Sequence, residues 1–212
     1  MKAEKDKDFP LDVTVIMCTV PSREKQAIEK FVEISNKAPI KWEILLIGDN
    51  KKRSIGKKRE AGLKLAQGKY VTWLDDDDDF TDFTYEEVNK VLKEDKDIIT
   101  GYQLAIINGV PGFVEFDLNT QNEEWIADGF TKRQPFPHGN FWKRELIQDI
   151  PFPDLNDAED WGWAKVALER IKSQSKIKKV IHIYKHDDRT SEAMRAERGD
   201  RNLRKGAGEI KE

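Results

Sequence analysis

The chain has 212 residues, a length that suits one α/β domain with a substantial buried core. Charged residues make up 36% of it but the formal net charge is only −3, which argues against a surface built to wrap nucleic acid. The single cysteine, Cys18, has no partner for an internal disulfide, and the longest apolar runs have the length of a strand. With no recognisable signal peptide, these features predict a soluble cytoplasmic protein without a membrane segment.

The first part of the chain predicts strands that alternate with helices. Three β-branched or apolar runs predict buried strands, at residues 13–18, 42–47 and 70–74. Ser22 and Ser54 are expected to cap the two helices between them, and a third helix opens at Thr84, which has capping-box spacing to Glu87. This β-α-β-α-β-α order implies a mostly parallel, Rossmann-like sheet with helices on both faces.

The second part predicts a different arrangement. Residues 98–107 and 113–118 flank a turn-rich segment with Asn-Gly, which is typical of an antiparallel hairpin. Residues 119–139 are expected to form a long loop. A helix around Trp161 and a last strand at 177–184 follow.

Five consecutive aspartates, at residues 75–79, directly follow the third predicted strand. Like charges concentrated at a sheet edge cost folding energy, and a hard divalent cation relieves that cost through oxygen ligands. The position of the run fits a ligand site, because parallel sheets bind ligands beyond the carboxyl ends of their strands. The run therefore indicates a site for a metal and a diphosphate.

Two other interpretations of the aspartates stay open. The run could be a solvated acidic turn. It could also be a calcium loop, since Asp75, Asp77, Asp79 and Glu86 fall at ligand positions of such a loop. However, Phe80 stands where that loop needs glycine, and a strand precedes the run where a helix is expected.

Four short segments occur in an order that is typical of one family. IGKKREAGL at 55–63 continues into AQGKY at 66–70, and YVTWLDDDD follows at 70–78. GNFWKREL at 139–146 comes next, and then Glu159-Asp160-Trp161. In this order they resemble the G-x-x-R-N-x-G-L approach, the DXD motif, the acceptor-side segment and the catalytic ED motif of GT-A glycosyltransferases of family 2. Glu60 replaces the usual asparagine. The compact chain is also similar to glycosyltransferase domains of large algal viruses.

The resemblance implies a GT-A fold: an α/β, Rossmann-like, mostly parallel sheet flanked by helices, with a small antiparallel hairpin on the acceptor side. It implies one domain over residues 1–190, with a nucleotide-binding half at 12–95 and an acceptor-side half at 96–190. Residues 191–212 would be a charged helix or linker, and the chain could belong to a longer multidomain protein. The implied reaction moves a sugar from a UDP-sugar to a hydroxyl acceptor with inversion, using Mn²⁺ or Mg²⁺. A viral origin would place it in the host cytoplasm.

The resemblance also implies the residues of the site. The donor nucleotide would be bound by Thr19, Pro21, Arg23, Asp49, Lys57, Arg59, Asp75 and Asp76. Asp49 would accept a hydrogen bond from the uracil edge, and Asp75 would face the ribose. The metal would be held by Asp77, Asp78 and His186, although five identical residues allow several DXD frames. The donor sugar or acceptor would contact His138, Asn140 and Trp161, whereas His182, within the last strand, is assigned a structural role.

Inversion needs a base that takes the proton of the acceptor hydroxyl. Asp160, which follows Glu159 in the ED motif, is the candidate, and Asp157 is its rival. Alternatively, these acids only stabilise the first turn of a helix.

Two other function classes stay open: a metal-dependent nucleotidyl or phosphoryl transferase, and a non-catalytic sugar- or calcium-binding module. The sequence contains no P-loop motif, so we do not expect a P-loop enzyme. Neither the sugar nor the acceptor is identified, and a glycan on a protein, a polysaccharide, a lipid-linked glycan or a modified nucleobase are all open as acceptors.

Overall fold

The computed structural model describes residues 10–121, 124–127 and 129–187. The described strands form one mixed sheet in the order β2-β1-β3-β9-β5-β6-β8-β7, with β10 paired to β5 and to the short β4. The strands are β1 (Leu11–Cys18), β2 (Trp42–Ile47), β3 (Gly68–Trp73), β4 (Asp79–Phe80), β5 (Ile98–Ile107), β6 (Val110–Phe116), β7 (Glu124–Ala127), β8 (Phe130–Arg133), β9 (Phe141–Lys143) and β10 (Gln174–His186). The helices are α1 (Glu24–Lys37), α2 (Ile55–Leu65), α3 (Thr84–Val91), α4 (Arg144–Ile147) and α5 (Glu159–Arg170), with 3₁₀ turns at Pro21–Arg23 and Leu92–Glu94.

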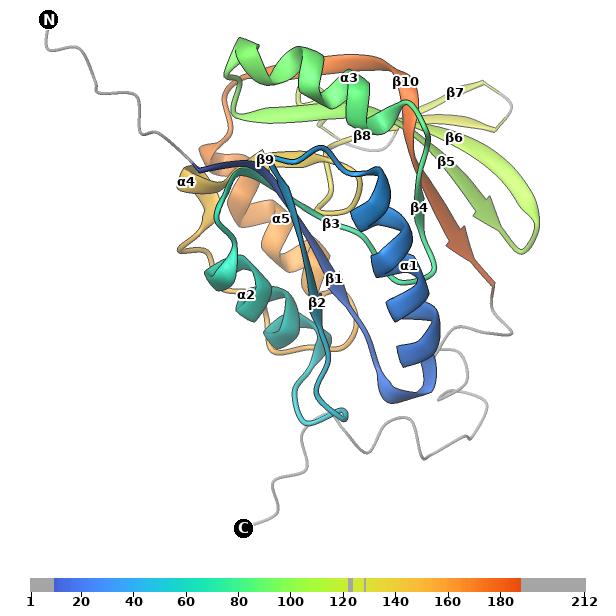
Figure 1. The fold of residues 1–212 in the computed structure, drawn as a ribbon. Helices are drawn as coiled ribbons and strands as arrows, with labels where there is room; N and C mark the ends of the chain where they lie inside the picture. The colour runs from blue at the N-terminus through green and yellow to red at the C-terminus, as the bar shows by residue number, and fades with distance from the viewer. Residues whose placement is uncertain (1–9, 122–123, 128, 188–212) are drawn as a thin grey trace, which may run out of the picture.

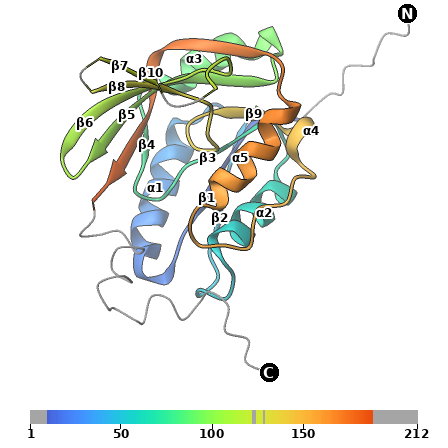
Figure 2. The same cartoon turned by 180° about the vertical axis from the view of Figure 1, so that it is seen from behind.

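Strands β2, β1 and β3 are parallel neighbours, and helices cover both of their faces. Along β1, Val13, Val15 and Met17 pack in one cluster with residues of α1 and α3. The alternate residues Ile16 and Cys18 pack in a second cluster with α2 and α5, as the period of two in a strand requires. Figures 1 and 2 show α1 and α2 on opposite sides of these strands. The predicted α/β sheet flanked by helices is confirmed.

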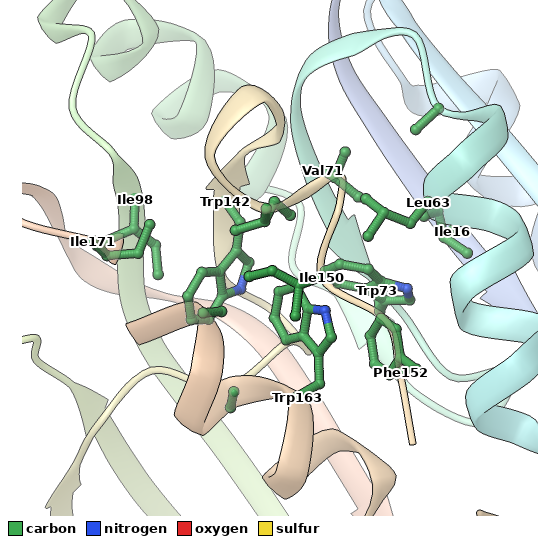
Figure 3. Packing of buried hydrophobic residues seen from close by; sticks show 14 of the residues in the cluster. Ile16, Leu63, Val71, Trp73, Ile98, Trp142, Ile150, Phe152, Trp163 and Ile171 are labelled. Atoms are coloured by element: carbon green, nitrogen blue, oxygen red, sulfur yellow. The ribbon is translucent and has the colours of Figure 1, made fainter. Parts of the chain in front are cut away.

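An aromatic cluster lies under the end of β3 (Figure 3). The ring centroid of Trp163 lies 5.0 Å from that of Trp73, 5.2 Å from that of Trp142 and 4.9 Å from that of Phe152. Aromatic pairs of this kind contribute about 0.5–1.5 kcal/mol each beyond their buried area. Because Trp73 is the last residue of β3, the cluster anchors the strand end from which the aspartates emerge.

The expected helix caps are partly confirmed. The Ser54 hydroxyl caps α2 by accepting a hydrogen bond from the backbone N–H of Lys57. The cap predicted at Ser22 is wrong, because Ser22 lies inside a 3₁₀ turn and α1 begins after Arg23. The capping box at Thr84 is also wrong, because its hydroxyl donates instead to the carbonyl of Ile181 at 2.6 Å and ties α3 to β10.

The predicted hairpin is present as β5 and β6. Its two-residue turn has positive φ at both Asn108 (52°) and Gly109 (83°), which is the conformation that matches strand twist. The strand after the turn starts at Val110, earlier than expected. The loop predicted at 119–139 is wrong in part, since β7 and β8 lie within it and β8 pairs in parallel with β6. The last strand extends beyond the predicted range at both ends.

Residues 191–212, the expected charged helix or linker, lie outside the described residues. Among the helices that the structure does describe, none has the length and apolar character needed to cross a bilayer.

Candidate functional site

The site forms where three parallel strands end. Because β1, β2 and β3 run in the same direction, the residues that follow them meet at one edge of the sheet. Thr19 follows β1, Asp49 follows β2, and the five aspartates follow β3. The Thr19 hydroxyl donates to the carboxylate of Asp76 at 2.9 Å, which ties two of these strand ends together.

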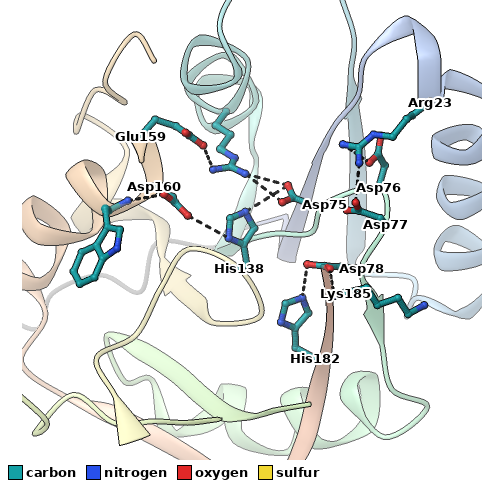
Figure 4. A network of polar contacts seen from close by, with 12 residues as sticks. Arg23, Asp75, Asp76, Asp77, Asp78, His138, Glu159, Asp160, His182 and Lys185 are labelled. Carbon is teal, nitrogen blue, oxygen red and sulfur yellow. Dashed lines mark hydrogen bonds and ion pairs between the residues drawn. The ribbon is translucent and has the colours of Figure 1, made fainter. Parts of the chain in front are cut away.

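Asp75 lies between an arginine and a histidine (Figure 4). Arg59 Nη2 donates to its carboxylate at 3.0 Å, and His138 Nε2 lies 3.5 Å away. Burial alone would raise the pKa of Asp75, but His138 and Arg59 hold it well below its usual range. In return, although burial would lower the pKa of His138, Asp75 brings it above its ordinary value.

The same arginine binds the first residue of the predicted ED motif. Arg59 Nη1 donates to Glu159, and both side chains are only 5% exposed. Burial raises the pKa of Glu159. This pair connects α2 to the start of α5, so the guanidinium joins three of the sequence motifs.

Asp76 and Asp77 share Arg23 as a partner. Arg23 Nη2 lies 2.8 Å from Asp76, and Arg23 Nη1 donates to Asp77 at 2.7 Å. Asp76 is fully buried, and burial raises its pKa to about 6. The side chain of Asp77 is 40% exposed, and burial of the rest raises its pKa too.

Asp78 and Asp79 are bound by β10. Buried Asp78 contacts His182 Nε2 at 3.1 Å and accepts a hydrogen bond from the backbone N–H of Lys185 at 2.9 Å. Asp79 accepts hydrogen bonds from the side chains of Lys30 and Lys185. The carboxylates of the run therefore divide into Asp75–Asp77 at the strand ends and the pair Asp78–Asp79, both of which contact Lys185 of β10.

The segment that carries His138 runs beside the end of β3. Gly139 N–H donates to the Trp73 carbonyl at 3.3 Å, and buried Asn140 donates to the carbonyl of His138 at 3.2 Å. Gly139 has φ of +66°, and a Cβ there would lie within 2.6 Å of the His182 ring, so glycine is required. This packing fixes His138 between two acids.

The second of those acids is Asp160, the candidate base. Its Oδ2 lies 4.0 Å from His138 Nδ1, and its side chain is 23% exposed. Asp157, the rival, is exposed in the segment before α5. Trp161, which follows Asp160, is 49% exposed and meets the ring of Phe136 edge-on at 5.1 Å. The structure therefore brings Asp160, and not Asp157, into the described network.

Asp49 has one carboxylate oxygen without a partner. Its Oδ2 accepts hydrogen bonds from the backbone and Nε of Arg53, whereas its buried Oδ1 has no hydrogen-bond partner in the described part of the chain. Such an atom carries a desolvation cost that a ligand N–H would relieve. A ligand that presents an N–H group at this point would therefore find an acceptor ready for it.

Three other residues that were predicted for the site lie outside the network around the aspartates. Lys57 is turned toward Glu60 of its own helix, at 2.8 Å. Pro21 is exposed at the start of the 3₁₀ turn. His186 ends β10, where its ring stacks on that of Tyr184.

Four further residues contact the site or its aspartates. Lys58, which is buried, donates to the carbonyl of Thr19 at 2.9 Å and supports the first strand end. His182, assigned a structural role, contacts Asp78. Lys30 and Lys185 bind Asp79. Lys58 belongs to the Lys57-Lys58-Arg59 run, which the sequence had suggested as a source of positive charge at the diphosphate. The other residues lie far along the chain from their partners, and no local pattern marks them.

The carboxylates fit a cation that is shared with a diphosphate. Across the described residues, no three His, Cys, Asp or Glu side chains converge as a complete metal site. Mg²⁺ sites commonly use only one or two carboxylates and complete the coordination with phosphates and water. Asp77 and Asp75 are the more exposed, at 40% and 30%, whereas Asp78 is buried. Both oxygens of Asp75, like those of Asp78, already accept or contact protein groups, so Asp77 is the most accessible of the three.

The family model described as "Glycosyl transferase family 2" matches residues 21–151, more than half of the chain. Among solved structures, S. aureus TarS 1-349 superposes with a TM-score of 0.62 at 18% identity, over 82% of this chain and 60% of that one. Its complexes with UDP and UDP-GlcNAc superpose with TM-scores of 0.60 and 0.58, at 18% and 17% identity, over 82% of this chain and 60% and 58% of theirs. This chain thus spans less than two thirds of the TarS fragment. No curated protein matches the chain.

Proposed function

Because this chain belongs to glycosyl transferase family 2, we propose that it transfers a sugar from a UDP-sugar to an acceptor hydroxyl, with inversion and with Mn²⁺ or Mg²⁺. The observation that carries the proposal is the meeting of Thr19, Asp49 and the aspartates at the ends of three parallel strands. TarS, a structural relative, has been solved with UDP and with UDP-GlcNAc, which supports a UDP-sugar as the donor.

The nucleotide would lie at the ends of β1 and β2. Asp49 Oδ1 is buried and without a hydrogen-bond partner among the described residues, so the N–H of a uracil ring can satisfy it. Asp75, with its ionised carboxylate, is suited to accept hydrogen bonds from ribose hydroxyls. A uridine nucleotide therefore matches the acceptor atoms that this edge presents.

The diphosphate would lie against Asp75 and Asp77. A divalent cation bound there would supply positive charge to the diphosphate as it leaves. Arg23 and Arg59 already lie beside these carboxylates and add fixed positive charge at the same place. Charge stabilisation that grows as the bond breaks is what raises the rate.

Asp160 would act as the base. It takes the proton of the acceptor hydroxyl while the hydroxyl oxygen bonds to the anomeric carbon and the bond from that carbon to the diphosphate oxygen breaks. UDP leaves with the bonding electron pair. His138 lies between Asp160 and Asp75, so it fixes the distance from the base to the donor side of the site.

The test is release of UDP. The protein is incubated with several UDP-sugars and Mn²⁺, and UDP is measured with and without candidate acceptors. Slow release without an acceptor that accelerates with one supports the proposal. Release of pyrophosphate from a nucleoside triphosphate indicates a nucleotidyl transferase. Metal binding without release of either UDP or pyrophosphate indicates a non-catalytic module.

A further inference from the structure

Two cations lie beside a half-exposed tryptophan at the first turn of α5. Arg133 Cζ lies 4.5 Å from the ring centroid of Phe136 and 5.8 Å from that of Trp161. Lys165 Nζ lies 5.6 Å from the Trp161 ring. We call Arg133, Phe136, Trp161 and Lys165 the cation–aromatic cluster. It joins the end of β8 to α5, directly beside Asp160.

No carboxylate among the described side chains neutralises the charges of this cluster. Among residues 10–121 and 129–187, whose side chains the structure describes, no carboxylate forms an ion pair with Arg133 or Lys165. The neighbouring Lys132, in contrast, is bound to Asp117 at 2.8 Å. Asp160 does not serve as their partner, because its carboxylate faces His138 (Figure 4). The cluster therefore has positive charge available for a ligand.

The cluster is arranged to hold an anion that is attached to an apolar surface. Contacts with two aromatic rings restrain the Arg133 guanidinium, so less entropy is lost when it binds a partner. A guanidinium donates two parallel hydrogen bonds to a carboxylate or a phosphate. The 49% of Trp161 that is exposed offers apolar area to the C–H groups of a sugar ring.

We propose that the cation–aromatic cluster is an acceptor subsite for an anionic sugar, one that carries a carboxylate or a phosphate. This inference rests on the proposed function, because it is the position of Trp161 beside the candidate base Asp160 that makes the ligand an acceptor. Arg133 and Lys165 bind the anionic group, and the Trp161 ring packs on the sugar. The substrate class is thereby narrowed to acidic or phosphorylated glycans.

The test measures binding at Trp161 directly. Protein with ¹⁵N-labelled tryptophan is saturated with UDP to fill the donor site, and the indole N–H signal of Trp161, assigned with Trp161→Phe, is followed by NMR. The probes are glucose, glucuronate and glucose 6-phosphate; the last two separate a carboxylate from a phosphate source. We expect either or both anionic probes to shift the signal with at least about tenfold higher affinity than glucose, the effect of one charge-assisted hydrogen bond.

Variants test the assignment to the cluster. The double variant Arg133→Gln, Lys165→Gln should lose the preference for anionic probes, whereas Lys41→Gln, which removes an exposed lysine before β2, should keep it. Equal shifts with glucose, no shift with any probe, or an unchanged preference in the double variant overturns the proposal. Release of UDP from a UDP-sugar without acceptor, measured on the same proteins before any UDP is added, reports separately on the proposed function, since the cluster takes no part in that step.

Discussion

Arg59 and Glu159 form an ion pair that is buried between α2 and α5, and the same guanidinium binds Asp75 at 3.0 Å. The arginine of the approach motif thus contacts both the first aspartate of the run and the ED motif. Removing one member of a buried pair leaves the other as an uncompensated charge. The pair therefore holds the donor side and the base side of the site together.

The free energy of unfolding should depend on the ion pair between Arg59 and Glu159. For Glu159→Ala we expect the free energy of unfolding to fall by about 3–5 kcal/mol, the usual cost of breaking a buried ion pair. The matched control is Lys25→Ala, which removes an exposed pair with Glu29 and should cost less than about 1 kcal/mol. Urea unfolding, followed by tryptophan fluorescence, gives both values. Equal costs would contradict the buried role of Glu159.

The buried Asp76 should make stability depend on pH. Burial raises its pKa to about 6 in the folded protein, above the value of roughly 3.9 in an unfolded chain. The folded state therefore binds the proton more tightly, and this contribution is complete below the unfolded pKa and lost as pH rises through the folded one. The free energy of unfolding of the wild type, relative to Asp76→Asn, should fall between about pH 4 and pH 6. Parallel stability curves would show that the pKa of Asp76 does not change on folding and would contradict the prediction.

Local patterns predicted the strands well. The parallel strands β1, β2 and β3 and the hairpin β5–β6 follow from continuous apolar runs and from an Asn-Gly turn, both of which act over a few residues. The resemblance to family 2 glycosyltransferases predicted nucleotide-binding residues at the strand ends, and two of these residues, Thr19 and Asp76, are in contact there.

Contacts between distant segments were not predictable. His182 and Asp78 are 104 positions apart, and nothing near His182 marks it as a partner of the aspartates. The Thr84 hydroxyl could form a hydrogen bond within its own helix or with the Ile181 carbonyl. It donates to the carbonyl because α3 packs on β10. Strand β8 forms inside the expected loop because β6 offers it an edge, which is a tertiary effect.

Loss of the exposed carboxylate of the run should abolish donor binding. Replacing Asp77 with alanine should remove metal-dependent binding of the UDP-sugar and leave the fold intact, because the change relieves repulsion among the aspartates. Calorimetry with and without Mn²⁺ measures the binding, and circular dichroism checks the fold. Asp82→Ala, at a side chain that is 88% exposed, is the control and should bind normally. Activity that survives in Asp77→Ala, with loss in Asp76 or Asp78 variants, would move the metal to another frame of the run.

The unpartnered oxygen of Asp49 should contribute to nucleotide affinity. An Asp49→Ala protein should bind UDP more weakly by roughly 1–3 kcal/mol, the cost of an unmet buried hydrogen bond. Arg53→Ala serves as the control, because it removes the ion pair at Oδ2 and leaves Oδ1 in place. If calorimetry finds the same UDP affinity in both variants, the carboxylate does not read the uracil edge.

The identity of the base is the most direct test of the chemistry. Asp160 lies beside His138 at the start of α5, whereas Asp157 is exposed, so we expect the two to differ. An Asp160→Asn protein should keep its UDP affinity and metal dependence, because the base contacts the acceptor and not the nucleotide. Its transfer rate should fall by about 10²–10⁴-fold, the usual contribution of a positioned base. Asp157→Asn should transfer at the wild-type rate, and a reversed outcome would assign the base to Asp157. Wild-type rates in both variants would remove the carboxylate base, and with it the inverting mechanism, from the proposed function.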